Sequence, residues 1–499
     1  MLVAQPCHDG LAGLTGFWSG LNPRSRTPMP PVGLGGAGVA IMPVRRGKAT
    51  TIPDLAMDKH RRLAEHSGGL ANERDRLLSE RAPMNAPDCF AAPDALLPLA
   101  DALALIAQRV APVAGVENRR LEQCLGRLLA TPLVAGLTQP PFANAAMDGF
   151  AMRFADLQTG SRHLPLAARI AAGHALPTTP PPGSAVRIFT GAPLPPEFDT
   201  VVMQEDCQLD GDSVILPTNI RAGSHVRLAG SDFKPGDTLL PAGCRLRPQD
   251  IGIAAALGLS RLQVKRRLKV GLFSTGDELV APGRPLGPGQ IYDSNRPMLR
   301  AALLAMGFEV HDLGHLADDL EGLANAFAVA ADSHDALVSS GGVSVGGEDH
   351  VRAALERLGQ IHFWRLAIKP GKPLALGRIG EATFLGLPGN PVSALIALLT
   401  VGRAVLHRLA GASTPASLPK PQWVPTAAIL AQAKNRLTFL RASLVQRDGG
   451  LFVLPYFSQD SSLLSSLVAS DGLIEVGAGV GPLAIGTMVA FHPYASLLG

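Results

Sequence analysis

The sequence has few cysteines, and they are poorly placed for a metal site or a disulfide framework. The five cysteines are odd in number and far apart, with no C-x-x-C pair and no zinc-type histidine spacing. The 13 histidines show no ligand spacing either. This pattern is typical of a reduced, cytoplasmic protein without a structural zinc site.

Charge of one sign and long hydrophobic runs are also scarce. Charged residues make up 17% of the chain and the formal net charge is +4, too little for an electrostatic grip on DNA or RNA. No uninterrupted apolar run approaches the roughly 18 residues that a membrane helix needs, and no basic and apolar leader follows Met1. We therefore expect neither a nucleic-acid nor a membrane partner, whereas an anionic small molecule stays open.

Motifs of several common enzyme classes are missing as well. No Walker A loop, no G-x-G-x-x-G after a strand and no Ser-His-Asp order is present. P-loop chemistry, a dinucleotide-binding fold and acyl transfer therefore have little support.

Length and composition predict several domains. With 499 residues, 46% of them hydrophobic, the chain is too long for one compact core, and three or four domains are expected. Residues 1–90 combine a Gly- and Pro-rich stretch with a very polar one, and no folded unit is visible there. We interpret them as a disordered extension or as the result of a misassigned start, with Met84 the alternative start. A basic interaction arm is the functional alternative.

The remaining chain changes from helical to β-like patterns and back. Apolar residues at helical spacing predict two helices, in 95–110 and 117–130. Short runs broken by Pro and Gly then predict a small β-rich module that ends near Leu228. From 268 to 410 strand and helix signals alternate, which predicts a parallel sheet with helices on both faces. After Pro419 short strands return, two of them joined by a Gly-Gly turn, and predict a small barrel.

The strongest local feature is the segment 335–349, DALVSSGGVSVGGED. An apolar strand runs into a glycine- and serine-rich loop with a closing acidic pair, and a helix is expected to begin near Asp349. Glycine amides and the N-terminal end of a helix dipole would hold a phosphate or a similar oxyanion. An ordinary glycine-rich turn is the alternative interpretation of this loop.

Acidic residues follow two other strands of the predicted sheet. Asp277 and Glu278 end one strand, and Asp318 and Asp319 follow another, where capping the next helix is the commoner role. Carboxylates beside an anion-binding loop repel the ligand unless a cation neutralises them. A hard divalent ion with oxygen ligands does so most simply, which predicts Mg²⁺.

Basic residues and a rigid turn complete the predicted rim. Arg365, Lys369 and Lys372 flank a Pro-Gly turn and can neutralise an oxyanion, although a solvated surface loop is their commoner role. In GLPGNPVS, Asn390 is predicted to cap a helix that has Pro391 at its first position. Such a turn would order backbone groups beside a ligand.

Seven sequence blocks point to one family. In chain order they are PPFANAAMDGFAMR, RIFTGAPLPPEFDTVVMQED, FSTGDEL, GQIYDSNR, SSGGVSVG, LAIKPGKP and GLPGNPVS. From about residue 95 to the C-terminus the chain resembles the MoeA and gephyrin E-domain family of molybdopterin molybdenumtransferases. The resemblance implies a multidomain α/β plus β fold. Its parts are a linking domain (94–137 plus 229–266), a small β-rich domain (138–228), a three-layer, parallel-sheet α/β pterin-binding domain (267–415) and a C-terminal β-barrel (416–499).

The resemblance also implies a reaction and partners. Molybdate would be inserted into adenylylated molybdopterin with Mg²⁺-dependent release of AMP, in a cleft between the subunits of a homodimer. Cleavage of a phosphoanhydride needs charge neutralisation and positioning more than a covalent nucleophile, so carboxylates, a divalent ion, lysine and amide donors suffice. Further partners would be the molybdopterin adenylyltransferase and acceptor molybdoenzymes.

The residues carried over from the family form three sets. The implied catalytic residues are Asp148, Thr190, Asp232, Glu278, Asp318, Asp349, Arg365 and Lys369. The first three would reach the site from the partner subunit. The residues implied to bind the pterin or its phosphate are Ser340, Gly341, Gly342, Ser344, Gly346, Lys372, Pro388, Asn390, Pro391, Arg441 and Ser461. The implied metal ligands are Asp232, Glu278 and Asp318.

Four positions depart from the family pattern. Arg365 stands where bacterial members can carry Lys, and Gly-Ser-Asp, ending at Asp232, replaces Gly-Glu-Asp. The segment DSSLLSSL around Ser461 replaces a Gly-Ser-His pattern, and Glu348 beside Asp349 leaves open which acid works.

Two other functions compete with the transferase. An adenylyltransferase resembles the α/β domain alone, and a non-catalytic scaffold of the gephyrin type would need no active site. The blocks AMDGFAMR and RIFTGAP outside the α/β domain argue against the first. The acids retained in the site argue against the second.

Overall fold

The computed structural model describes residues 96–317, 319–341, 350–413, 417–447 and 449–499. Several predictions fall outside these ranges. They are the extension 1–90 with Met84, and the site residues Asp318, Gly342, Ser344, Gly346, Glu348 and Asp349.

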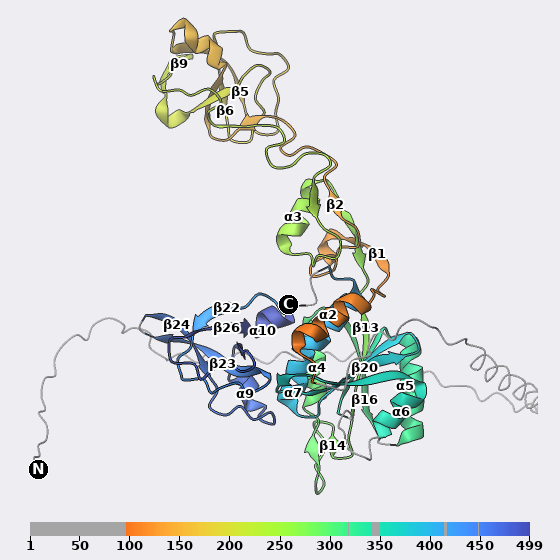
Figure 1. Ribbon diagram of the computed structural model, residues 1–499. Helices are drawn as coiled ribbons and strands as arrows, with labels where there is room; N and C mark the ends of the chain where they lie inside the picture. The colour runs from red at the N-terminus through yellow and green to blue at the C-terminus, as the bar shows by residue number, and fades with distance from the viewer. Residues whose placement is uncertain (1–95, 318, 342–349, 414–416, 448) are drawn as a thin grey trace, which may run out of the picture. The chain divides into compact units, whose positions relative to one another are not determined.

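A six-stranded sheet in the order β16-β13-β17-β21-β20-β18 lies at the centre of the α/β region (Figure 1). The predicted parallel arrangement is confirmed for β16, β13, β17 and β21. β20 instead pairs antiparallel with both neighbours, because only Gly380 and Glu381 separate it from β21 and so short a link makes a hairpin. The strands are β13 (Lys269–Thr275), β16 (Glu309–Leu316), β17 (Ala336–Ser340), β18 (Gly359–Arg365), β20 (Pro373–Ile379) and β21 (Ala382–Leu387).

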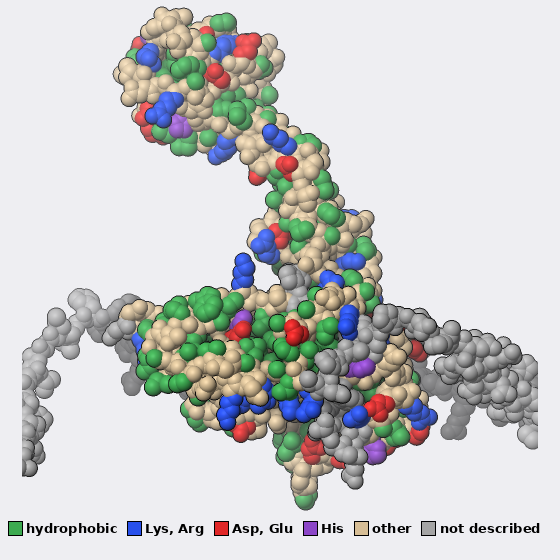
Figure 2. Space-filling view, in the orientation of Figure 1, with side chains coloured by type: hydrophobic (Ala, Val, Ile, Leu, Met, Phe, Trp, Pro, Cys, Tyr) green, Lys and Arg blue, Asp and Glu red, His purple; other side chains and the backbone are tan. Residues whose placement is uncertain are grey.

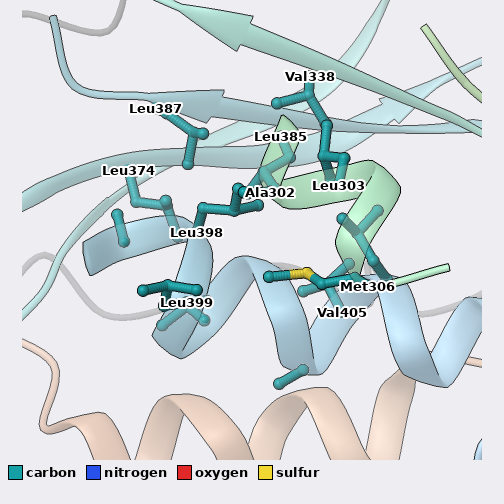
Figure 3. Close-up of a cluster of buried hydrophobic side chains, with 14 of the residues drawn as sticks. Ala302, Leu303, Met306, Val338, Leu374, Leu385, Leu387, Leu398, Leu399 and Val405 are labelled. Atoms are coloured by element: carbon teal, nitrogen blue, oxygen red, sulfur yellow. The ribbon is translucent and has the colours of Figure 1, made fainter. Parts of the chain in front are cut away.

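Alternate residues of the sheet pack into two separate cores, as strand geometry requires. Leu272, Val338 and Leu385 face one layer of helices, and Phe273, Leu337 and Phe384 face the other. Figure 3 shows the first core, where Val338, Leu385 and Leu387 of the sheet meet Leu398 and Leu399. The helices are α4 (Asn295–Ala305), α5 (Leu320–Ser333), α6 (His350–Leu358), α7 (Pro391–Ala397) and α8 (Arg403–Ala410).

One helical stretch is long and apolar enough to cross a membrane by length and composition alone. It runs from Pro391 to Ala410 through α7, the π-helical turn η4 (Leu398–Gly402) and α8. The most apolar part of this stretch is 78% buried inside the protein. Packing between the sheet and α2 (Leu99–Arg109) therefore explains its apolar character.

The stretches 96–137 and 229–266 pair with each other. β1 (Val116–Arg120) joins β12 (Arg261–Lys265), and β2 (Leu133–Val134) joins β11 (Thr238–Leu240). α3 (Pro248–Ala256) packs Ala254 against the cluster they form. These pairings link two segments that lie about a hundred residues apart in sequence.

One of the two helices predicted here is confirmed and the other is wrong. α2 (Leu99–Arg109) occupies the first predicted stretch. The second, 117–130, forms β1 followed by the short 3-10 turn η1 (Leu121–Gln123). Five residue pairs with β12 satisfy the backbone of β1, and Gly126 adopts a φ of +73° that no helix interior has.

Residues 138–228 form a second six-stranded sheet, in the order β7-β4-β6-β5-β9-β8. Side chains pack on both of its faces, Val186 and Ile188 on one side and Phe150 and Met152 on the other. β3 (Asn144–Ala145) and β10 (Val226–Arg227), which precede and follow the strands of this sheet in the sequence, form a separate short antiparallel pair. The strands are β4 (Gly149–Met152), β5 (His163–Ile170), β6 (Ala185–Ile188), β7 (Thr200–Met203), β8 (Gln208–Asp210) and β9 (Ser213–Ile215).

The C-terminal strands close into a barrel. β24 pairs with β23, and a bridge between Thr426 and Val453 ties β24 back to the segment that follows β22. Gly449 and Gly450, both at positive φ, stand at the predicted Gly-Gly turn before β24. Hydrophobic side chains also gather on the barrel surface (Figure 2). Trp423 and Ile429 are exposed residues of the C-terminal region. The strands are β22 (Gln422–Pro425), β23 (Leu437–Arg447), β24 (Gly450–Pro455), β25 (Gly472–Val476) and β26 (Met488–Pro493). The four domain boundaries themselves stay a prediction.

Candidate active site

Buried polar groups meet where β17 and β21 end. Ser340, the last residue of β17, is 2% exposed, and its Oγ accepts a 2.9 Å hydrogen bond from Nδ2 of Asn295. The same nitrogen donates at 2.5 Å to the carbonyl of Gly389, in the turn after β21. Gly341 follows at a φ of +93°, and its amide donates to the carbonyl of Leu387 at 3.1 Å. We call Asn295, Ser340, Gly341 and the turn 388–391 the rim.

The sequence reasoning missed Asn295. The block GQIYDSNR served only as a family signature, although a polar residue opening a helix directly after a strand was a usable signal. Its Oδ1 is buried and has no hydrogen-bond partner among the described residues. An acceptor left over in this way at a strand end is a candidate contact for a donor group of a ligand.

A buried carboxylate, also missed, fixes the start of α4. Asp293 is 1% exposed and accepts a 2.6 Å hydrogen bond from Ser274 Oγ of β13. It also pairs with Arg296 at 2.9 Å, and Arg296 reaches Asp312 of β16. These contacts tie α4 to two strands, so that Asn295 is held in place beside Ser340.

The turn after β21 differs in one detail from its prediction. Asn390 does precede α7 and Pro391 does take its first position, but the Asn390 side chain makes no capping hydrogen bond. Its Nδ2 instead donates at 3.2 Å to Ser461 Oγ in the barrel, and the amide of Val392 donates to the carbonyl of Ser461, also at 3.2 Å. Ser461 is therefore joined to the turn 388–391 through contacts from two residues, whereas its role in binding the pterin stays a prediction.

Arg441 lies beneath the loop that carries Ser461. It is fully buried, and burial lowers the pKa of its guanidinium. Its Nε donates to Ser466 Oγ at 3.0 Å and its Nη2 to the carbonyl of Asp460 at 2.8 Å. Arg441 therefore holds this loop in place, whereas its direct contact with a ligand stays a prediction.

The acids of the predicted metal set are not assembled in the described part of the chain. Glu278 is exposed just after β13, with its carboxylate folded back over Gly276, where a Cβ would lie 2.5 Å from Oε2. Asp232 is exposed, and its backbone amide donates to the carbonyl of Gln139. Among the described residues no group of three or more His, Cys, Asp or Glu side chains could hold a metal ion. Asp319 caps α5, accepting from the amide of Gly322 at 2.7 Å, as its commoner role predicted.

The basic residues lie along the loop from the end of β18 to the start of β20. Arg365 is the last residue of β18, Lys369 belongs to the short strand β19 (Ile368–Lys369) within the loop, and Lys372 directly precedes β20. Arg365 and Lys369 are exposed and Lys372 is half-buried. Backbone hydrogen bonds from Leu97 to the Arg365 carbonyl and from Leu366 to the Lys372 carbonyl, both 2.8 Å, tie this loop down. The three cations are thus held on an ordered loop rather than on a free one.

A separate polar cluster, which we call the corner, lies on the small β sheet. Asp148 directly precedes β4 and Thr190 follows β6. The amide and Oγ1 of Thr190 both donate to Asp148 Oδ1 at 2.7 Å. These hydrogen bonds lower the pKa of Asp148, with a smaller contribution from Arg187. Among the described residues no hydrogen bond or ion pair joins the corner, the rim and Asp232 to one another.

The rim lies at the C-terminal ends of the strands of a mostly parallel sheet. Multidomain proteins with such a sheet form a class in which ligands bind at these strand ends. Three family descriptions match successive parts of the chain. They are the MoeA N-terminal region (domain I and II) at 97–258, the probable molybdopterin binding domain at 271–408 and the MoeA C-terminal region (domain IV) at 424–494.

Curated relatives and solved structures agree with these matches. The chain is 38% identical over 385 residues to a molybdopterin molybdenumtransferase of Haemophilus influenzae, covering 77% of this chain and 95% of that one. A protein of the same name from a Nostoc species is 40% identical over 294 residues, 57% of this chain and 67% of that one. A molybdopterin biosynthesis MoeA protein of Pyrococcus horikosii superposes with a TM-score of 0.64 at 30% identity, covering 80% and 99% of the two chains. This chain belongs to the MoeA family of molybdopterin molybdenumtransferases.

Proposed function

We propose that this protein inserts molybdate into adenylylated molybdopterin and releases AMP. The rim carries this proposal. Ser340, Gly341 and Asn295 place a hydroxyl, a glycine at positive φ and an amide oxygen without a partner among the described residues at one strand end. The glycine-rich segment that follows Gly341 leads into α6, which begins at His350. Amides of such a segment, followed by a helix start, suit the terminal phosphate of a pterin.

The basic loop residues and the turn 388–391 would neutralise and orient the anhydride. Arg365, Lys369 and Lys372 supply positive charge from one ordered loop, and Arg365 can bind an oxyanion through two parallel hydrogen bonds. Pro388 and Pro391 stiffen the turn that places Asn390 against Ser461. Positioned charge of this kind lowers the barrier to phosphoanhydride cleavage without a covalent intermediate.

A magnesium ion beside the rim is part of this proposal, although the described residues do not by themselves assemble a metal site. Mg²⁺ keeps several waters and binds through one or two carboxylates together with substrate phosphates. The exposed Glu278 carboxylate suits such a loosely held ion, with Asp318 and Asp232 as its further ligands. When bound, the ion would supply charge neutralisation at the anhydride.

The corner would complete the site from a second subunit. Asp148 is partly exposed and ionised, and Thr190 is exposed beside it. An exposed, ordered carboxylate of this kind suits a shared cleft, so a homodimer in which Asp148, Thr190 and Asp232 face the rim of the other subunit is part of the proposal. A cytoplasmic location and contacts with the adenylyltransferase and acceptor molybdoenzymes belong to it as well.

AMP release tests the reaction. Purified protein with adenylylated molybdopterin, molybdate and Mg²⁺ should release AMP without consuming ATP and should yield active cofactor. No release at saturating substrate would reject the transferase, and ATP consumption would favour the adenylyltransferase. AMP release also distinguishes the transferase from the non-catalytic scaffold of the gephyrin type, because a scaffold would release no AMP.

Two carboxylate variants test the site. Asp148→Asn and Glu278→Gln should each reduce release by about 100-fold or more, the size typical of a lost electrostatic contact in a transition state. Matched controls are Asp210→Asn on β8 and the exposed Glu381→Gln in the β20–β21 turn, which should stay within twofold of wild type. Wild-type turnover in either site variant would remove that residue from the mechanism.

A further inference from the structure

Arg187 lies on β6, the strand that is followed by Thr190 of the corner. There it lies directly across from Phe150 of β4. Its guanidinium carbon lies 4.8 Å from the ring centroid of Phe150 and 5.1 Å from that of Phe189. Contacts with two aromatic faces hold a planar cation in one orientation, which a flexible surface arginine lacks.

The same guanidinium leads by hydrogen bonds to the strand that carries Asp148. Nη2 of Arg187 donates to Oε1 of Gln204, and the backbone amide of Gln204 donates to the carbonyl of Asp148 at 3.1 Å. The side-chain amide of Gln204 in turn donates to Glu205 at 3.0 Å. Arg187 is therefore connected to the backbone of Asp148, and Phe189, one of its two rings, directly precedes Thr190.

The backbone of β4 leaves little freedom at this point. Gly149 follows Asp148, and a Cβ there would lie 1.9 Å from the carbonyl oxygen of Val202 on β7. Only glycine allows so close an approach, which fixes the start of β4 between β6 and β7. Asp148 thus projects from a rigid strand start, and the contacts that remain to orient it are those from Thr190 and the Arg187 network.

We propose that Arg187 is a positioning residue of the active site, which holds the Asp148 and Thr190 pair in register. Among the described residues no hydrogen bond joins it to the Asp148 carboxylate, and it acts through Gln204, Phe150 and Phe189. Its positive charge also lowers the pKa of both Asp148 and Glu205, in addition to the larger effect of their hydrogen bonds. The role in catalysis rests on the proposed function, whereas the effect on Asp148 does not.

A neighbouring arginine provides a matched control. Arg169 of β5 is the register partner of Arg187 and lies 4.5 Å from the same Phe189 ring. Among the described residues it makes no hydrogen bond to Gln204 or Asp148. Arg187→Met and Arg169→Met therefore remove the same charge and a similar ring contact from adjacent positions, and only the first breaks the network.

The test measures the titration of Asp148 directly. In protein labelled with ¹³C at aspartate carboxyls, with Asp148→Asn used to assign the signal, Arg187→Met should raise the pKa of Asp148 and Arg169→Met should leave it unchanged. Arg187→Lys should restore part of the shift, because it keeps the charge but not the planar contacts. An unchanged Asp148 titration in Arg187→Met would overturn the proposal, as would equal shifts in the two Met variants.

The catalytic part is tested by the pH profile of AMP release. Removing Arg187 makes Asp148 bind its proton at higher pH, so the acid limb should move to higher pH and kcat should fall about tenfold or more. Arg169→Met should keep the wild-type profile. If Asp148→Asn itself retains full activity, the proposed function fails at this residue, whereas the titration result still stands. If Arg187→Met does not fold, Arg187→Lys is measured instead. With a melting temperature near wild type it should still shift the acid limb part of the way, and an unchanged profile would count against the proposal.

Discussion

The rim and the corner are both polar, but they are built in opposite ways. At the rim Ser340 and Asn295 are 2% and 9% exposed, and their hydrogen bonds connect α4, β17 and the turn after β21. At the corner the partners Asp148 and Thr190 are partly or fully exposed, and one side chain holds the other. Buried polar groups need their partners for stability as well as for function, whereas exposed groups have water as an alternative.

This difference teaches where stability and activity are coupled. A change at the rim removes a hydrogen bond that nothing replaces, so it should lower the stability of the fold and the activity together. A change at the corner exchanges a protein partner for water, so it should alter the charge of Asp148 and the activity while the fold persists. Three variants test this contrast, in order of decreasing effect on stability.

Arg441→Met should have the largest effect on stability. It removes charged hydrogen bonds to Ser466 and Asp460, and we expect a loss of about 3 kcal/mol, since hydrogen bonds to charged groups contribute roughly 1.5–3 kcal/mol each. The loop with Ser461 should then detach from Asn390. Thermal unfolding with hydrogen exchange at 458–466 measures both effects. Arg447→Met, on the same strand but exposed, is the control, and equal losses in the two variants would contradict the role of Arg441.

Asn295→Ala should come next. It leaves Ser340 Oγ and the Gly389 carbonyl without their donor, which costs about 1–3 kcal/mol for buried groups. AMP release should fall in parallel, because the rim loses both its order and a ligand contact. The exposed Asn325→Ala on α5 serves as control. If Asn295→Ala kept normal stability and normal AMP release, the expected coupling of stability and activity at the rim would be wrong.

Thr190→Val should leave the fold unchanged and still affect Asp148. The backbone amide of Thr190 remains as a donor, but the Oγ1 donor is lost, so the depressed pKa of Asp148 should rise toward its ordinary value of about 3.9. A depressed carboxylate pKa stabilises the folded state above the unfolded value and loses this contribution as pH falls through the folded value. The variant should therefore lose activity from the acid side, and Thr190→Ser should restore it. A loss of stability as large as that of Asn295→Ala would show that the corner resembles the rim after all.

Much of the fold could be predicted from local pattern. Alternating strand and helix signals located β13, α4, β16, α5 and β17, and α6 begins at His350, next to the expected Asp349. The second predicted helix failed because the apolar spacing of 117–130 has the period of a helix, while its backbone partner, β12, lies some 140 residues downstream. Pairing across such a distance leaves no trace in local periodicity.

The candidate site shows the same division between residue identity and residue role. Ser340, Gly341, Asn390 and Ser461 were named from the sequence, and hydrogen bonds link Ser340 through Asn295 to the turn that contacts Ser461, while their binding role stays a prediction. Arg441 was expected to face a ligand, and its burial became visible only with β23 and the 458–466 loop in place. Asn295 and Arg187 were passed over, because a hydrogen bond between α4 and β17, or a ring contact between β4 and β6, depends on the register of distant segments.

The sequence by itself determined the family, the alternation that builds the α/β sheet, and the residue types that make a phosphate-binding chemistry available, because each of these is encoded in neighbouring residues. Tertiary structure alone decided which polar side chains are buried and which remain in water, and which of them meet. Burial and hydrogen bonding are properties of pairs of segments, and here they join α4 to β17, the barrel to α7, and Arg187 to the strand start that carries Asp148.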